Sequence, residues 1–170
     1  MARAGLGDEP AFRVLARRHL APSLGLAVRI TGNRSDAEEV VQEALLRVWV
    51  NAPRWTPSAA FRTWLYRVVV NLCLDRRRRV PMAPLEEAGD PPDPEPDAAA
   101  RIESAETARM VADAVQALPE RQRMALVLTY YQGLSNAETA AVLETTVSSV
   151  EALLVRAKRA LRVRIDRMDT

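Results

Sequence analysis

Arginine and lysine side chains crowd one segment near the end of the 170-residue chain, where they could bind the phosphates of a nucleic acid. The apolar residues of this segment recur at the spacing of one buried helical stripe: Val147, Val150, Leu154, Ala157 and Leu161. Its later turns carry the basic residues Arg156, Lys158, Arg159, Arg162 and Arg164. The pattern predicts a helix that packs by one side and presents cations by the other.

A second helix is predicted directly before this basic one. Ser135 and Glu138 have the spacing of a capping box, and a short helix then runs to Leu143. Residues 144–146 make the turn between the two helices. This arrangement is typical of a helix-turn-helix, whose second helix enters the major groove of DNA. The alternative at this point is an ordinary helical hairpin.

A second basic cluster, Arg76–Arg79, ends a long helix predicted over about 59–79. Upstream, Arg54, Arg62 and Arg67 alternate with aromatic residues, a composition that holds single-stranded DNA by charge and stacking. The alternative is that these cations only favour a helix C-terminus. Periodicity places four residues of this helix in the core: Phe61, Trp64, Leu65 and Val68. Trp55, in the loop, is then the candidate exposed ring. Asn71 falls in mid-helix, where its amide could read a base edge or make a local contact.

Carboxylates line one side of a third helix, predicted over 36–50. Asp36, Glu39 and Glu43 fall on successive turns of one face. The residues alone favour a solvated face whose acids suit a helix N-terminus. The alternative is a polar docking surface for a partner protein.

Few other residues suggest chemistry. The single histidine, His19, and the single cysteine, Cys73, form no metal-ligand cluster and no internal disulfide. We expect a half-buried or surface histidine and a small core cysteine. No nucleophile elbow, phosphate loop, pair of catalytic acids, signal peptide or membrane span is recognisable. The sequence therefore predicts a cytoplasmic protein that is not an enzyme, inserts in no membrane and needs no cofactor.

Charge and proline divide the chain. Residues 1–80 carry a net charge of +7, residues 81–107 a net charge of −7, and residues 108–170 a net charge of +2. Six of the 11 prolines fall within 81–96, where few residues are bulky and apolar. We predict an all-α protein of two small helical domains, 8–80 and 101–168, joined by a flexible, acidic, proline-rich linker over 81–100.

Further boundaries follow from caps and breakers. A first helix containing Phe12 and Leu20 is kinked or restarted at Pro22 and ends at Gly32-Asn33. Ser35 and Glu38 predict a capping box for the helix that ends near Val50, and residues 51–58 form a loop. In the second half, a helix ends near Leu118, and Pro119 begins another that ends at Gly133.

Taken in order, four stretches resemble the extracytoplasmic-function (ECF) branch of the sigma-70 family of bacterial sigma factors. They are SDAEEVVQEALLRVW (35–49), FRTWLYRVVVNLCLDRRRR (61–79), ALPERQRMALVLTYYQGLS (117–135) and VRAKRALR (155–162). The resemblance implies family regions 2 and 4, which bind core RNA polymerase and direct it to promoters. It also implies an anti-sigma factor as a further partner.

The resemblance assigns roles to the residues that match. Asp36, Glu39, Gln42 and Glu43 would dock on the clamp helices of the largest polymerase subunit. Region 4 would touch the β flap as well as the −35 duplex. The expected −10 contacts are Trp55, Arg62, Asn71, Arg76, Arg77, Arg78 and Arg79, and the expected −35 contacts are Thr146, Ser148, Ser149, Glu151, Ala152, Val155, Arg156 and Arg159.

Two residues depart from the family pattern. Glu144 occupies a turn position that is often glycine, so a positive φ there would strain the turn. Glu151 stands where a basic residue is usual; it could accept a hydrogen bond from cytosine N4, or close a capping box with Ser148. Two other functions stay open from the residues alone. One is a helix-turn-helix regulator that acts without polymerase, and the other is a degenerate sigma-like interaction module.

Overall fold

The computed structural model describes residues 1–56, 60–79 and 98–168, without the side chains of 79, 98–104 and 167–168. The described residues form helices and no strand. In chain order the elements are α1 (Ala2–Gly5), α2 (Glu9–Thr31), α3 (Arg34–Asn51), the 3-10 turn η1 (Ala52–Arg54), α4 (Phe61–Arg79), α5 (Ala98–Gln116), α6 (Glu120–Leu126), the π-helical turn η2 (Val127–Tyr131), α7 (Asn136–Val142) and α8 (Val147–Met168). The all-α prediction is confirmed.

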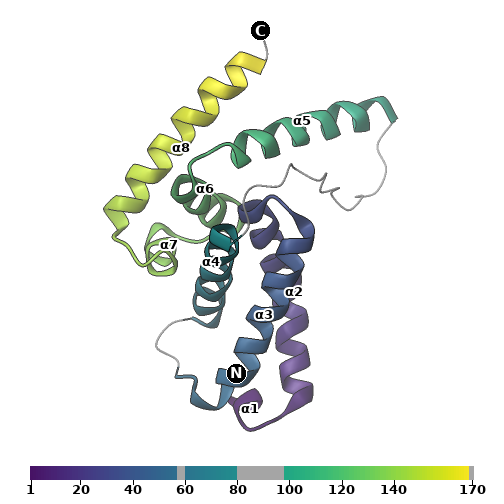
Figure 1. Cartoon of the computed structure of the whole chain (residues 1–170), viewed down its shortest axis with the longest axis vertical. Helices are drawn as coiled ribbons and strands as arrows, with labels where there is room; N and C mark the ends of the chain where they lie inside the picture. The colour runs from purple at the N-terminus through teal and green to yellow at the C-terminus, as the bar shows by residue number, and fades with distance from the viewer. Residues whose placement is uncertain (57–59, 80–97, 169–170) are drawn as a thin grey trace.

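The N-terminal half is a bundle of α2, α3 and α4, and α1 packs against η1 at one end (Figure 1). Its fully buried side chains include Leu26, Ile30, Val41, Val48 and Leu65. They recur three or four residues apart within each helix, so each helix buries one face against the other two. Burial of these faces is the main source of the bundle's stability.

Two local signals delimit α2. The Asp8 carboxylate accepts a hydrogen bond from Ala11 N at 2.9 Å, which caps the first turn. At the other end Gly32 adopts a left-handed conformation (φ 76°), and its N–H donates to Val28 O. Between them the helix runs through Pro22 without restarting, so of the two expectations at this proline the restart is wrong.

The predicted cap of α3 is also wrong. The N-cap is Asn33, two residues before the expected Ser35, and its side chain accepts from Asp36 N at 2.9 Å. Asn33 takes extended geometry directly after left-handed Gly32, so the helix begins as soon as the chain has reversed. Glu38 then pairs with Arg34 at 2.9 Å instead of closing a capping box.

The C-terminal half packs α6, α7 and α8 around Leu128, Val142 and Val150. The capping box at Ser135 is confirmed: Ser135 Oγ accepts from Glu138 N, and Glu138 Oε2 accepts from Ser135 N. The bond from Ser135 N, and next the Ser135 hydroxyl, hold the pKa of the Glu138 carboxyl group below its usual value. Helices α5 and α8 diverge from α6 in a V (Figure 1).

A π-helical turn replaces the end of the single helix expected over 119–133. Pro119 lies at the N-cap of α6, and η2 continues α6 to Tyr131, where Gln132 N donates to Val127 O at 3.0 Å. Such wide turns rotate the side chains that follow and recur at functional sites. Here the rotation involves Tyr131 and Gln132.

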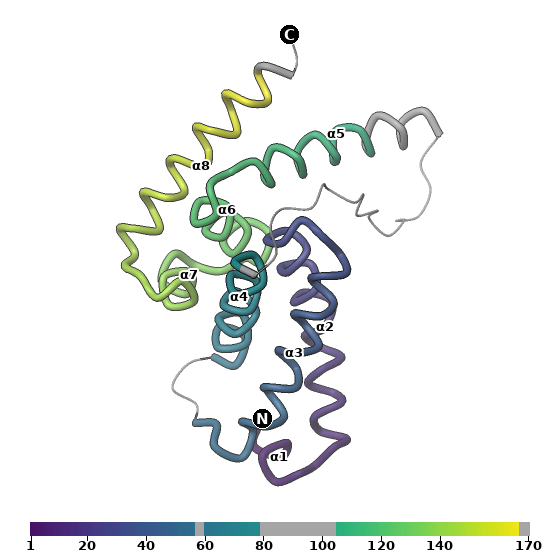
Figure 2. Tube along the Cα trace, viewed as in Figure 1, coloured from purple at the N-terminus to yellow at the C-terminus, as the bar shows by residue number. Residues whose placement is uncertain are grey.

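The two halves touch. Helix α4 lies against α7, and the end of α2 lies against α5, α6 and η2 (Figure 2). The buried residues of both halves form one continuous cluster. Most of the linker predicted over 81–100 lies outside the described residues, although α5 already begins at Ala98. No helix among the described residues is both long enough and apolar enough to cross a membrane.

Candidate nucleic-acid interface

The first turn of α8 carries a cluster of hydroxyl groups. The hydroxyl of Thr146 accepts from Ser149 N at 3.2 Å, which caps the helix. The same oxygen lies 3.1 Å from Ser148 Oγ and 2.8 Å from Ser149 Oγ. Because Thr146 is the capping residue, the proposed capping box between Ser148 and Glu151 is wrong. All three hydroxyl side chains are exposed and available to a phosphate or base edge.

Helix α8 separates a buried face from an exposed one. Val150, Leu154 and Ala157 are buried as predicted, whereas Val147, placed in the same stripe, is 42% exposed. The buried stripe begins one turn later, at Val150, because Val147 is the first residue of α8 and other helices do not cover it. The exposed face carries the expected −35 contacts Ser148, Ser149, Glu151, Ala152, Val155, Arg156 and Arg159.

The turn before α8 contains the strained residue foreseen from the sequence. Glu144 has a φ of 51°, a left-handed conformation that costs a residue with a Cβ about 1 kcal/mol. Its carboxylate lies 3.9 Å from Arg67 Nη1 and is well exposed, so this ion pair contributes little.

We therefore expect Glu144→Gly to raise the free energy of unfolding by about 0.5–1 kcal/mol, because glycine adopts this φ without strain. Urea denaturation of the two proteins measures the difference. Glu144→Ala is the matched control, since it removes the same carboxylate but keeps the Cβ and should give no gain. Equal stability of all three proteins would contradict the strain.

The predicted −10 contacts do not share one environment. Asn71 and Arg78 are exposed on α4. Trp55 is half-buried, not an open ring, and packs edge-on against Phe61 with the ring centroids 6.4 Å apart. The structure does not describe the side chain of Arg79.

Arg76 joins two sets of residues that the sequence had assigned to different partners. Its Nε donates to Asp36 Oδ1 at 2.7 Å, and its Nη1 donates to Glu39. These bonds raise the pKa of Arg76, with Asp36 the main cause. The cation expected at −10 DNA therefore neutralises two of the three acids expected at polymerase, Asp36 and Glu39, while Gln42 and Glu43 lie beside them on α3. Glu43 pairs with Arg47 at 2.9 Å.

The C-terminal end of α2 is capped by side chains from other helices, and we call this contact the seam. Gln116 Nε2 donates to Arg29 O at 2.8 Å, and Arg123 Nη1 donates to Ile30 O at 3.2 Å. Arg77, expected at DNA, also donates to Ile30 O at 3.4 Å. Cations suit the negative end of a helix dipole. Both Gln116 and Arg123 belong to the C-terminal half, so they fasten it to the N-terminal half.

Arg123 is the buried cation of the seam. It is 3% exposed, donates also to Leu118 O and Gln116 Oε1, and burial lowers its pKa to about 10. The sequence analysis missed it, although a signal was present. Arg123 stands one turn before buried Val127, on the apolar face of its helix.

The seam continues along α4. Tyr66 Oη donates to Gln132 Oε1 at 2.9 Å, and burial raises the pKa of Tyr66. Arg67 Nη2 donates to Ala141 O at 2.9 Å, and Arg62 pairs with Glu138 at 3.3 Å. The side of α4 that bears Arg62 and Arg67 therefore lies against the first helix of the helix-turn-helix, although the two side chains stay 42% and 36% exposed.

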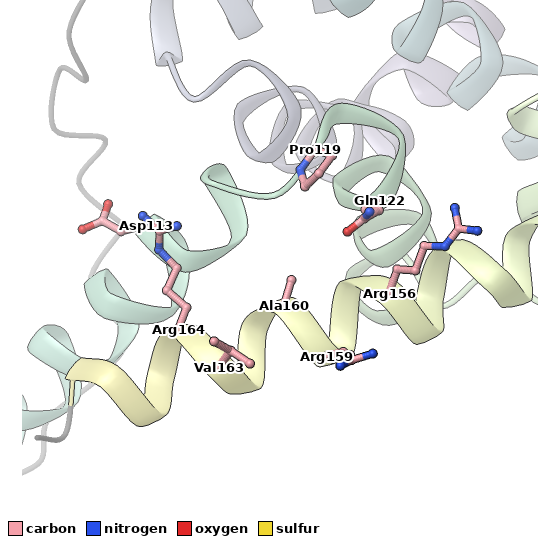
Figure 3. A pocket seen from close by; sticks show the side chains of 8 residues that line it. All are labelled: Asp113, Pro119, Gln122, Arg156, Arg159, Ala160, Val163 and Arg164. Atoms are coloured by element: carbon pink, nitrogen blue, oxygen red, sulfur yellow. The ribbon is translucent and has the colours of Figure 1, made fainter.

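A groove lies between the start of α6, the end of α5 and the later turns of α8 (Figure 3). It has a volume of about 930 Å³. Ala160 and Val163 give it an apolar side on α8, and Pro119 and Gln122 face them. Its charged lining is three arginines, Arg156, Arg159 and Arg164, and one acid, Asp113 on α5, so the basic groups predominate. An apolar channel with basic edges fits an acidic amphipathic helix.

Cys73, set aside in the sequence analysis as a core residue, is fully buried. Burial raises the pKa of its thiol to about 12, so little thiolate forms at neutral pH. The expectation of a small core residue is confirmed.

The fold and the exposed basic face of α8 define a helical DNA-binding protein of two modules. Residues 15–80 match the family Sigma-70 region 2, and residues 108–161 match Sigma-70, region 4. The chain belongs to the sigma-70 family, in its ECF branch of RNA polymerase sigma factors.

Relatives match nearly the whole chain. The ECF RNA polymerase sigma factor SigM of Mycobacterium tuberculosis is 38% identical over 91% of this chain and 77% of its own length. The RNA polymerase sigma-H factor of Pseudomonas aeruginosa is 33% identical over 94% and 88%.

The solved structure of CnrH in complex with the cytosolic domain of CnrY matches 98% of this chain and 94% of its own, with a TM-score of 0.72 and 31% identity. A TM-score of that size over both halves shows that their arrangement is similar in the two proteins.

Proposed function

We propose that this chain directs RNA polymerase to a set of promoters by binding core polymerase, a −35 duplex and the opened −10 strand. The observation that carries the proposal is the exposed face of α8. Hydroxyl, carboxylate, apolar and arginine side chains lie together on about its first three helical turns, directly after the strained residue Glu144 and the Thr146 cap. A helix of this kind fits the major groove. The protein itself then needs no catalytic residue, because the polymerase performs the chemistry.

The first turns of α8 would read the −35 element. Arg156 can bind guanine through two hydrogen bonds, Glu151 can accept one from cytosine N4, and Val155, 68% exposed, can contact a thymine methyl group. The hydroxyls of Thr146, Ser148 and Ser149 are suited to the backbone, which fixes the register of the helix.

Helix α4 would hold the −10 strand after the duplex opens. Asn71 and Arg78 are exposed for this role, whereas Arg62 and Arg77 first have to leave Glu138 and Glu120 of the C-terminal half. The −35 and −10 elements lie about 25 base pairs apart, or roughly 85 Å at 3.4 Å a step. Helix α8, at about 33 Å, is far shorter. We therefore expect that promoter binding requires the seam to open.

The acidic face of α3 would dock on core polymerase. We expect Glu43→Arg to weaken core binding at least about tenfold, because it places a like charge against a surface that attracts carboxylates. Glu38→Arg is the matched control on the same helix: it makes the same charge change and loses an equivalent ion pair, with Arg34. Titration of labelled core polymerase measures both. Equal losses in the two variants would move the docking surface elsewhere.

The groove beside α8 is the candidate surface for the β flap of polymerase, since its apolar side and basic edges suit an acidic helix. An anti-sigma factor is the further partner we propose, on the likeness to CnrH, whose structure was solved with CnrY. Both partners act by contact and neither requires a cofactor.

Transcription in vitro tests the proposal. The purified chain is mixed with core polymerase that lacks other sigma factors, over fragmented genomic DNA, and start sites are mapped. Discrete starts that share two upstream elements are expected. If the chain does not bind core polymerase but binds an operator tightly by itself, the result would support a polymerase-independent regulator. If it binds core polymerase without giving transcription, the result would support a degenerate interaction module.

A further inference from the structure

A second cavity opens where the two halves meet. It has a volume of about 520 Å³, and helices α2 and α4 of the N-terminal half and η2 of the C-terminal half form its walls. The polar groups that define it are Arg18, His19 and Arg29 on α2, Arg62 on α4, and Tyr131 and Gln132 at the end of η2. Neither the −35 face of α8 nor the acidic face of α3 contributes to it.

The charges around this cavity have one sign. Three arginines and a histidine line it, and no aspartate or glutamate of the described residues belongs to its lining. Glu138 offsets Arg62 from outside the lining, at 3.3 Å. Arg18 has no carboxylate partner among the described residues and is exposed to the cavity mouth. The field is strong enough that, after burial, Arg18 and Arg62 are the charges that lower the pKa of His19. A cleft lined by one sign of charge concentrates ions of the other sign.

Three of the groups that surround the cavity, Arg29, Tyr131 and Gln132, are held in place by contacts within the protein. The guanidinium of Arg29 lies over the Tyr131 ring, 4.4 Å from its centroid, and donates to Gly25 O at 3.2 Å. Gln132 is fixed by Tyr66, whose hydroxyl donates to it. The π-helical turn of η2 presents Tyr131 and Gln132 to α2 and α4. A rigid set of donors loses little entropy when an anion binds.

We propose that this cavity binds a small phosphorylated anion with two or more phosphoryl groups, and that the anion holds the two halves together. Planar guanidinium groups bind phosphate oxygens in pairs, which favours this class over monovalent anions. A volume of about 520 Å³ accommodates a ligand of nucleoside diphosphate size. The consequence for promoter binding rests on the proposed function, but anion binding itself does not.

The anion is coupled to closure because both halves form its walls. When the halves separate, Tyr131 and Gln132 leave Arg18, Arg29 and Arg62, and the site is lost. A ligand that binds only the closed arrangement shifts the population toward it. Such an anion opposes promoter binding, which needs the halves apart.

Calorimetry and fluorescence test the site on the full chain. Inorganic pyrophosphate, adenosine diphosphate and a short single-stranded DNA are titrated separately. Dyes at Leu46→Cys and Arg162→Cys report the distance between the halves, while native Cys73 is buried and escapes labelling. We expect saturable one-to-one binding of pyrophosphate or the nucleotide, with increased energy transfer between the dyes.

Two neighbouring arginines supply the matched variants. Arg18→Gln should weaken pyrophosphate binding about tenfold or more, since hydrogen bonds to charged groups contribute 1.5–3 kcal/mol. Arg17→Gln removes the same charge one residue away, outside the lining, and should change binding less than about twofold. Equal losses of pyrophosphate affinity in the two variants would show that binding depends only on the net charge of the protein.

Three other results would overturn the proposal: no saturable binding of either small anion, binding that leaves the dye distance unchanged, or binding only of the DNA strand with the same Arg18 dependence. The last would make the cavity part of the nucleic-acid surface. Promoter-specific transcription with core polymerase would proceed in each of these cases, so failure of the anion site is distinguishable from failure of the proposed function.

Discussion

Replacing Arg123 with alanine is expected to open the seam and cost about 3 kcal/mol of stability. The guanidinium lies 3% exposed and donates to Ile30 O across the seam and to Leu118 O within its own half. Its loss leaves Leu118 O and Gln116 Oε1 without this donor, while Ile30 O keeps the 3.4 Å bond from Arg77, and each unsatisfied group costs about 1–3 kcal/mol. Removal of a buried charge returns part of that free energy.

The effect should be visible in two measurements. Urea denaturation gives the stability, and the dyes on Leu46→Cys and Arg162→Cys give the separation of the halves. Arg121→Ala is the control, because Arg121 lies two residues away on α6 and is exposed. It should be within about 0.5 kcal/mol of the parent chain.

A second variant separates opening from loss of folding. Gln116→Ala removes the bond to Arg29 O without emptying the position of a buried cation. It should widen the dye distance in the same direction at a smaller cost. An Arg123→Ala protein that is destabilised but still closed would show that this residue supports only its own half.

Opening also predicts a gain in DNA binding by the free chain. Arg62 pairs with Glu138 at 3.3 Å and Arg77 lies 3.8 Å from Glu120 in the closed arrangement, and both arginines lose these partners when the halves separate. The affinity of Arg123→Ala for single-stranded −10 DNA should therefore exceed that of Arg121→Ala. Fluorescence anisotropy at one fixed salt concentration measures it, because such affinities depend steeply on salt.

Replacing Arg156 with alanine is expected to cost about 1–3 kcal/mol in promoter binding, or roughly 5- to 150-fold, and to relax the preference at one −35 position. The side chain lies on the exposed face of α8, one turn after Ala152, where a recognition helix approaches base edges. No described carboxylate pairs with it, so a base does not have to displace a partner.

Arg162→Ala is the matched control for Arg156→Ala. Arg162 lies on the same helix, farther from its N-terminus, and is also exposed. It should weaken all sequences about equally and lower the salt dependence of binding by about one ion, as a phosphate contact does. Selection of bound sequences from randomised −35 duplexes, with the polymerase holoenzyme of each variant, distinguishes a base contact from a phosphate contact. Uniform weakening by Arg156→Ala would assign it to the backbone.

Local patterns were sufficient for the helices and for the main features of the helix-turn-helix. The Ser135 capping box and the buried stripe of Val150, Leu154 and Ala157 depend on neighbours three or four positions apart. The possibility of a positive φ at Glu144 came instead from the family pattern, in which that turn position is often glycine. Two of the local errors have local causes. Asn33 competes with Ser35 as a cap, and Val147 lies too early in α8 to be covered.

Partner choice across the chain was decided by tertiary structure alone. Arg76 meets Asp36 40 positions away, and Arg123 meets Ile30 93 positions away. Periodicity tells which face of a helix is apolar, but not which polar groups of another helix will lie opposite its edges. Arginines that the sequence assigned to DNA are therefore engaged within the protein, by the acidic face of α3 and by the seam. The types and order of the helices could be predicted from the residues, because they depend on local patterns. The closed arrangement of the two halves depends on how their faces pack, which only the tertiary structure shows.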